Sequence, residues 1–189
     1  KSTLLKLAMG LFQPTSGAVL IDGVDLRQLD PSELRSQVGY VPQEAVLFYG
    51  SLRENLTLSH PQATDAAIVR SIDIANLGEF VNRHPQGFDM MIGERGDSLS
   101  GGQRKSVALA RGVIGEPSLL LMDEPTGSMD HSSETAVQRE LREFVKGRTW
   151  LVVTHRNALL EMVDRIIVID NGKLVADGPR ANVVEALQQ

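Results

Sequence analysis

The chain has 189 residues, of which 42% are hydrophobic and 23% are charged, and its formal net charge is −5. This length and composition are those of a globular domain with its own core, and they exclude a disordered chain. The absence of Cys excludes disulfides and thiolate metal sites, and the negative charge argues against a general nucleic-acid or anionic-membrane surface. No apolar run approaches the roughly 20 residues that a membrane-spanning helix needs.

The chain opens with KSTLLKLAMGLF, in which a Lys and two hydroxyl residues stand directly before apolar residues at helical spacing. One interpretation is an ordinary capped helix. The other is the end of a phosphate-binding loop, G-x-x-x-x-G-K-[ST], in which the Lys reaches the phosphates and the next hydroxyl binds Mg²⁺. In the second interpretation the glycines of the loop would precede residue 1, and these three residues alone do not decide between the two.

Hydrophobic patterning and capping signals predict an alternation of strands and helices at both ends of the chain. Strands are expected at 18–22, 38–42, 118–122, 149–154, 165–170 and 173–176. Helices are expected to begin after Asp30 and Ser51 and to span 64–83, 99–114, 131–146 and 180–188. The runs LLLM and WLVV are typical of strands buried on both faces of a parallel sheet, and Asn171-Gly172 predicts a hairpin.

The segment from about 51 to 115 is expected to be mostly helical, whereas the two ends alternate between strand and helix. We therefore predict an α/β fold in which 1–43 and 116–189 form one parallel-sheet core. Residues 44–115 would form a helical subdomain inserted into that core and able to move against it.

Two adjacent carboxylates, Asp123 and Glu124, follow the apolar strand SLLLM directly. Ligands of open α/β sheets bind at the carboxyl ends of the strands. One carboxylate there could support Mg²⁺, which prefers hard oxygen ligands, while the other deprotonates a water. The alternative is a solvated junction between strand and turn.

The segment LSGGQRKSVALARGVI, residues 99–114, carries a capping box, because Gln103 follows Ser100 by three residues. A well-capped helix explains this pattern, but it does not explain Gly101 and Gly102 in the first turn, because Gly is about 1 kcal/mol worse than Ala inside a helix. Two glycines leave backbone N–H groups open at the positive end of the helix dipole, where a phosphate can approach. The hydroxyl of Ser100 would add a donor.

Two further polar residues follow predicted strands. Gln43 comes after YVP and His155 comes after VVT. A single Gln or His at a strand end is most often a loop residue, so neither indicates a site by itself.

The order KST, YVPQ, LSGGQ, LLLMDEP, SMD and VTH runs across nearly the whole chain. In this order and rough spacing the chain is similar to the nucleotide-binding domain of an ABC transporter. The resemblance implies a P-loop NTPase-like core, the cofactors ATP and Mg²⁺, and ATP hydrolysis coupled to transport. It also implies that the chain starts inside its Walker A loop and that this fragment alone is inactive.

The resemblance assigns roles to the residues of the first half of the site. Lys1, Ser2 and Thr3 would end the Walker A loop, with Lys1 on the phosphates and Ser2 on Mg²⁺. Gln43 would be the Q-loop glutamine, which contacts Mg²⁺ or water and links the core to the helical subdomain. Asp123 would be the Walker B carboxylate on Mg²⁺.

The remaining roles concern hydrolysis and the second nucleotide-binding domain. Glu124 would be the general base, His155 the switch histidine near the γ-phosphate, and Asp130 part of the D-loop. In this family the signature of one domain faces the Walker A loop of a second, which implies a homodimer. The signature residues that would contact the nucleotide are Ser100, Gly101, Gly102 and Gln103.

The segments VLFYGSLRENLTL and MIGERGDSLSGGQ resemble the exporter branch, and the combination with VALARGVI, MDEPTGSMD and VTHR is similar to type I secretion ATPases. This implies a transmembrane domain fused upstream, a place on the cytoplasmic side of the bacterial inner membrane, and export of proteins. Lipid, drug or peptide exporters are the alternatives. A non-transport ABC ATPase acting on DNA is a further one, which the negative charge and the lack of Cys and of heptads disfavour, and no nucleic-acid partner is expected.

Overall fold

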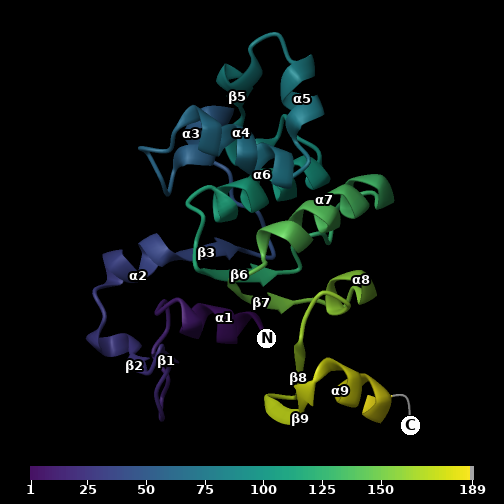
Figure 1. Ribbon diagram of the computed structural model, residues 1–189. Coiled ribbons are helices and arrows are strands. Elements are labelled where there is room, and N and C mark those ends of the chain that lie inside the picture. Colours follow the sequence, from purple (N-terminus) through teal and green to yellow (C-terminus); the bar gives the residue numbers. More distant parts are fainter. Residues whose placement is uncertain (188–189) are drawn as a thin grey trace. The chain divides into compact units, whose positions relative to one another are not determined.

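The computed structural model describes residues 1–187, without the side chain of Leu187 (Figure 1). Contacts divide the chain into two compact units, which are described in turn. One unit is Ser2–Val153, and the other is Thr154–Gln189 together with Lys1.

The larger unit is built on a parallel sheet of three strands in the order β3 (Val38–Val41), β6 (Leu119–Asp123) and β7 (Thr149–Val153). The middle strand β6 is almost wholly buried, which confirms the interpretation of the run LLLM. The run WLVV of β7 is only partly buried, because β7 lies at the edge of this sheet in the described part of the chain.

Helices α1 (Ser2–Ala8) and α6 (Gly101–Val113) lie on opposite sides of the sheet in Figure 1. The helix α6 approaches β3 so closely that a Cβ on Gly39 would stand 2.1 Å from the carbonyl oxygen of Gly112. A Cβ on Gly112 would stand 2.7 Å from Cγ2 of Val41. Two glycines that face each other therefore allow the helix backbone to rest directly on the strand.

The segment after β3 is mainly helical, as predicted, and contains α3 (Leu52–Thr57), α4 (Asp65–Ile74) and α5 (Gly78–Arg83) besides α6. Two strands of two residues, β4 (Gly50–Ser51) and β5 (Met91–Ile92), pair in this segment, and two 3₁₀ turns, Gly87–Asp89 and Glu94–Gly96, precede α6.

The prediction of one helix over 64–83 was wrong. The helix is interrupted between α4 and α5, where Asn76 has φ 54°. This left-handed conformation ends a helix, and Asn tolerates it better than most residues.

The other elements of this unit follow local signals. Strands β1 (Leu20–Ile21) and β2 (Val24–Asp25) form a small hairpin, and the 3₁₀ turn Leu26–Gln28 follows it. Helix α2 (Pro31–Gln37) begins at the cap Asp30, as predicted, because the Asp30 carboxylate accepts hydrogen bonds from the next two free backbone N–H groups. Helix α7 (His131–Phe144) begins at the cap Asp130.

The smaller unit contains α8 (Asn157–Leu160), the antiparallel pair β8 (Arg165–Asp170) and β9 (Lys173–Pro179), and α9 (Arg180–Leu187). The predicted hairpin is confirmed, since Asn171 and Gly172 both have positive φ, 46° and 76°, as a type I′ turn requires. The helix predicted over 180–188 is observed to its end at Leu187, and position 188 lies outside the described residues.

Within the described residues, no helix combines the length and the apolar character needed to cross a bilayer. The division into a core of 1–43 and 116–189 with a helical subdomain of 44–115 stays a prediction.

Candidate functional site

Two of the predicted site residues lie at neighbouring strand ends. Strands β3 and β6 run in parallel with Val41 opposite Met122, so that Gln43, two residues past β3, comes off the same edge of the sheet as Asp123. The Asp123 side chain is only 2% exposed, and within the described residues its carboxylate has no hydrogen bond or ion pair. A buried carboxylate without a direct hydrogen bond needs positive charge nearby, and the ammonium of Lys105 supplies part of it.

Glu124 follows Asp123 in a left-handed conformation with φ 48°. Its backbone N–H donates to the carbonyl oxygen of Val153 over 2.8 Å, and its own carbonyl accepts from Gly127 over 3.2 Å. The strand β6 thus ends in a strained backbone conformation at Glu124. Strain of this kind is common at functional sites.

The first helix begins beside this strand. Ser2 is the half-buried first residue of α1, and α1 packs onto β6 with Leu5 completely buried. In Figure 1 the N-terminal end of α1 points to the same side as the arrowheads of β6 and β7. Ser2 thus opens a helix that packs on β6, while Thr3 is exposed.

The predicted capping box at the signature, Leu99–Gln103, is confirmed. The Ser100 hydroxyl accepts from the Gln103 N–H over 3.1 Å, and the Gln103 side chain accepts from the Ser100 N–H over 2.8 Å. These bonds leave the Ser100 O–H and the N–H groups of Gly101 and Gly102 without a hydrogen bond to any described residue.

The two signature glycines have different surroundings. A Cβ on Gly102 would lie 3.2 Å from the carbonyl oxygen of Ser128, whereas a Cβ on Gly101 would meet no atom closer than 3.8 Å. Position 102 thus has little room for a side chain, because it packs against the segment before Asp130. The sequence did not reveal this reason for the glycine. Gly101 stays open to an approaching group.

Asp130 caps α7 through three neighbouring groups. Its carboxylate accepts from the Ser132 hydroxyl over 2.5 Å, from the Ser133 N–H over 3.0 Å and from the Ser133 hydroxyl over 2.7 Å. These bonds hold the pKa of Asp130 well below its usual range, and the bond from the Ser132 hydroxyl has the largest effect.

A residue that sequence reasoning missed lies between the signature and the strand ends. Lys105 is 4% exposed, and its ammonium donates to the carbonyl oxygens of Pro42, Gln43 and Asp123 over 2.8, 2.7 and 3.3 Å. Burial lowers the pKa of Lys105, and the charges of Asp123 and Glu124 oppose that shift. Burial raises the pKa of the Tyr40 phenol, and Asp123 adds to this effect.

Lys1 and His155 belong to the smaller unit. Lys1 is exposed. His155 stands two residues after the end of β7, in a short turn where the Arg156 N–H donates to the Thr154 hydroxyl over 3.0 Å. Their roles stay predictions.

The donor set suits Mg²⁺ better than a metal held by the protein alone. Among the described residues, no group of three His, Asp or Glu side chains is placed to hold an ion. Mg²⁺ takes one or two carboxylates and completes its shell with water and substrate phosphates. The buried carboxylate of Asp123, with Gln43 following the neighbouring strand at the same edge, fits that mode.

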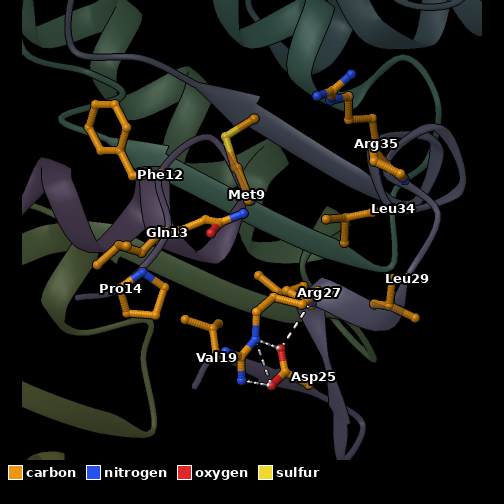
Figure 2. A pocket seen from close by; sticks show the side chains of 14 residues that line it. Met9, Phe12, Gln13, Pro14, Val19, Asp25, Arg27, Leu29, Leu34 and Arg35 are labelled. Carbon is orange, nitrogen blue, oxygen red and sulfur yellow. Dashed lines mark hydrogen bonds and ion pairs between the residues drawn. The ribbon is translucent and has the colours of Figure 1, made fainter. Parts of the chain in front are cut away.

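A cavity of about 210 Å³ lies elsewhere, between the end of α1, the β1–β2 hairpin and α2 (Figure 2). Its lining is mainly apolar, and the charged pair in it is satisfied internally, since Arg27 Nη2 and Asp25 Oδ2 are 2.5 Å apart. None of the predicted site residues lines this cavity, which therefore has no part in the site.

Comparisons with known proteins agree with the resemblance. A family model described as "ABC transporter" matches residues 1–127. A "Multidrug efflux ATP-binding/permease protein" of Mycobacterium bovis (strain BCG / Pasteur 1173P2) is 42% identical over 185 residues, which are 98% of this chain and 16% of that protein. An uncharacterized ABC transporter ATP-binding protein of Bacillus subtilis (strain 168) is 39% identical over 186 residues, which are 98% of this chain and 32% of that protein.

A solved structure described as "Structure of a bacterial Atm1-family ABC exporter with ATP bound" matches with a TM-score of 0.93 and 33% identity, over 98% of this chain and 33% of that one. This match confirms the predicted α/β fold class, a parallel-sheet P-loop NTPase domain. The chain spans a third or less of the length of these relatives.

Proposed function

Since this chain belongs to the ABC transporter family, we propose that it is the ATP-binding and ATP-hydrolysing domain of an ABC exporter. The observation that carries this proposal is the meeting of Gln43, Asp123 and Glu124 at the ends of two adjacent parallel strands. Helix α1, which begins at Ser2, packs against the same strand β6, and we propose that the Ser2 hydroxyl joins that edge.

The residues divide the chemistry of phosphoryl transfer to water. Ser2, Gln43 and Asp123 would hold Mg²⁺, which supplies neutralising charge at the phosphates when bound. Glu124, which follows Asp123 in a left-handed backbone conformation, accepts the proton of the attacking water. Lys1 and His155 belong to the smaller unit, and their roles at the phosphates stay predictions.

The signature supplies a second phosphate contact. The Ser100 O–H and the N–H groups of Gly101 and Gly102 are not used by the described chain, and they stand at the positive end of α6. We propose that they bind the γ-phosphate of a nucleotide held by a second copy, so that ATP is buried between two copies of this domain, and that Asp130 lies at the same interface.

A patch on the helical segment supports a transmembrane partner. Tyr49 is 74% and Phe48 is 52% exposed, with Val46 and Leu58 exposed beside them. Exposed apolar patches mark interaction surfaces. Asn55 fixes the turn by accepting from the Phe48 N–H over 2.9 Å and donating to the Phe48 carbonyl over 2.8 Å. The relative named as an "ATP-binding/permease protein" supports a transmembrane domain as the occupant of this patch. We propose that the chain lies on the cytoplasmic side of the bacterial inner membrane.

The relatives named as multidrug efflux proteins support a small molecule as the exported substrate. Export of proteins by type I secretion, which the sequence suggested, has no such support from the relatives and stays a prediction.

The experiment measures Mg²⁺-ATP hydrolysis by the full-length protein that contains this chain. Glu124→Gln should lower kcat about 10²–10⁴-fold, because a general base contributes that factor. The matched control is Glu143→Gln. This change removes an exposed carboxylate of α7 that is paired with Lys146, just beyond the end of the helix. A wild-type protein that does not hydrolyse ATP contradicts the proposed function, and full activity of Glu124→Gln contradicts the role of Glu124.

A further inference from the structure

The buried ammonium of Lys105 joins three elements of the larger unit. Lys105 lies in the second turn of α6, the helix that begins at the signature, and its three N–H groups meet three carbonyl oxygens. Two of them follow β3, at Pro42 and Gln43, and one ends β6, at Asp123. An ammonium has three donors and no acceptor, so this set satisfies it completely.

The position of this charge is costly unless something compensates for it. Burial of an ammonium in a protein interior requires partners, and hydrogen bonds to charged groups are stronger than neutral ones. Here the partners are backbone carbonyls, and the carboxylates of Asp123 and Glu124 supply the opposite charge nearby. The arrangement ties the backbone of Gln43 and Asp123 to the signature helix.

We propose that Lys105 is a positioning residue for ATP hydrolysis, which holds Gln43 and Asp123 in a fixed relation to the signature helix. A displacement of the start of α6 by a bound nucleotide then moves the loop of Gln43 and the end of β6 with it. This inference rests on the proposed function, and it adds a residue that contacts neither nucleotide nor metal.

A purely structural role for Lys105 makes a different prediction. If its bonds only stabilised the fold, any variant of α6 with a similar loss of stability would behave in the same way. Val113→Ala is the matched control, because Val113 is buried at the other end of α6 and its side chain has no group that could hydrogen-bond to a carbonyl.

The first measurement is kinetic and uses the full-length protein. Lys105→Met should lower kcat roughly 10–100-fold, the range for residues that orient metal ligands from behind. The KM for ATP should stay close to the wild-type value, because no contact to the nucleotide is lost. Lys105→Gln, whose amide keeps two N–H donors, should lie between Lys105→Met and wild type.

The second measurement needs neither nucleotide nor hydrolysis. Glu44 is exposed next to Gln43, so a glutamate-specific protease reports on the order of this loop. In ATP-free protein, Lys105→Met should raise the rate of cleavage after Glu44 roughly tenfold, because the loop loses two charge-assisted hydrogen bonds. Mass spectrometry quantifies this cleavage, and Val113→Ala should leave it unchanged.

Wild-type kcat together with wild-type cleavage after Glu44 in Lys105→Met would overturn the inference. The same changes in Val113→Ala would overturn it too. If Lys105→Met does not fold, Lys105→Gln is compared with Val113→Ala instead. The same two measurements, kcat and the rate of cleavage after Glu44, then decide. A wild-type protein without ATPase activity refutes the proposed function instead, and the cleavage rates still decide whether Lys105 orders the loop.

Discussion

The two ends of α6 use glycine for opposite purposes. In the first turn, Gly101 is exposed, and a Cβ on it would meet no atom closer than 3.8 Å, which is an ordinary contact distance. In the last turn, Gly112 lies against β3, and a Cβ on the opposing Gly39 would stand 2.1 Å from the Gly112 carbonyl. One glycine leaves room for a ligand and the other for a strand, so a glycine in a helix acquires its meaning only from what faces it.

A substitution where the C-terminal end of α6 packs on β3 should have the largest effect on stability. Gly39→Ala places a methyl group against a backbone carbonyl that cannot rotate away, so α6 and β3 must separate. Overpacking of this kind costs typically up to about 3 kcal/mol. Unfolding of the chain in guanidinium, followed by the fluorescence of its single Trp, Trp150, measures this loss.

The control for that variant is Gly93→Ala, where the nearest atoms to an added Cβ are 3.9 Å away. Its stability should stay within about 0.5 kcal/mol of wild type. An equal loss in both variants would show that the contact between Gly39 and Gly112 is not tight.

A substitution of Gly101 at the start of α6 should change stability and ATPase activity in opposite directions. Gly101→Asp places a negative charge at the start of α6, which stabilises a helix by about 0.3–1 kcal/mol. The same charge repels a phosphate, and it should lower ATP hydrolysis by the full-length protein roughly 100-fold or more, as loss of a preorganised donor does. Wild-type hydrolysis in this variant would refute the assignment of the signature to phosphate.

Two capping boxes with the same N-cap residue, one closed by Glu54 and the other by Gln103, allow a finer comparison. Ser51 of α3 and Ser100 of α6 both form capping boxes, and each hydroxyl accepts a backbone N–H over 3.1 Å. Replacement of either by Ala should cost about 1 kcal/mol of stability. Only Ser100→Ala should also reduce the ATPase rate, and an equal reduction in Ser51→Ala would show that the loss of the cap, not of the hydroxyl at the phosphate, is responsible.

Much of the fold was predictable because its signals are local. The apolar run of β6, the caps at Asp30, Ser51 and Ser100, and the Asn171-Gly172 turn each act within a few residues. Two details were missed although signals for them exist. Asp22-Gly23 predicts the β1–β2 hairpin, and Asn76 with Gly78 marks the break between α4 and α5.

The candidate site was predictable as far as its residues follow strand ends or open a helix. The role of Lys105 was not, because a Lys on a helix is normally solvated. Its burial depends on carbonyls at Pro42 and Gln43, more than 60 positions earlier in the chain. The left-handed backbone of Glu124 is likewise set by its bond to Val153 of a neighbouring strand.

A charged cap should respond to pH where the neutral cap of α6 does not. The bonds from the Ser132 hydroxyl and from Ser133 depress the pKa of Asp130, so the folded state binds a proton less readily than the unfolded one. The stabilisation is therefore present above the unfolded pKa of about 3.9 and is lost as the pH falls through the lower pKa of the folded state.

Asp130→Asn keeps a capping side chain that does not titrate, so the difference in unfolding midpoint between wild type and this variant should shrink between pH 7 and about pH 3. The difference between wild type and Ser100→Ala should stay constant over the same range, since the Ser100 cap does not titrate. A constant difference between wild type and Asp130→Asn would mean that the three hydrogen bonds stabilise the Asp130 carboxylate no better than water does.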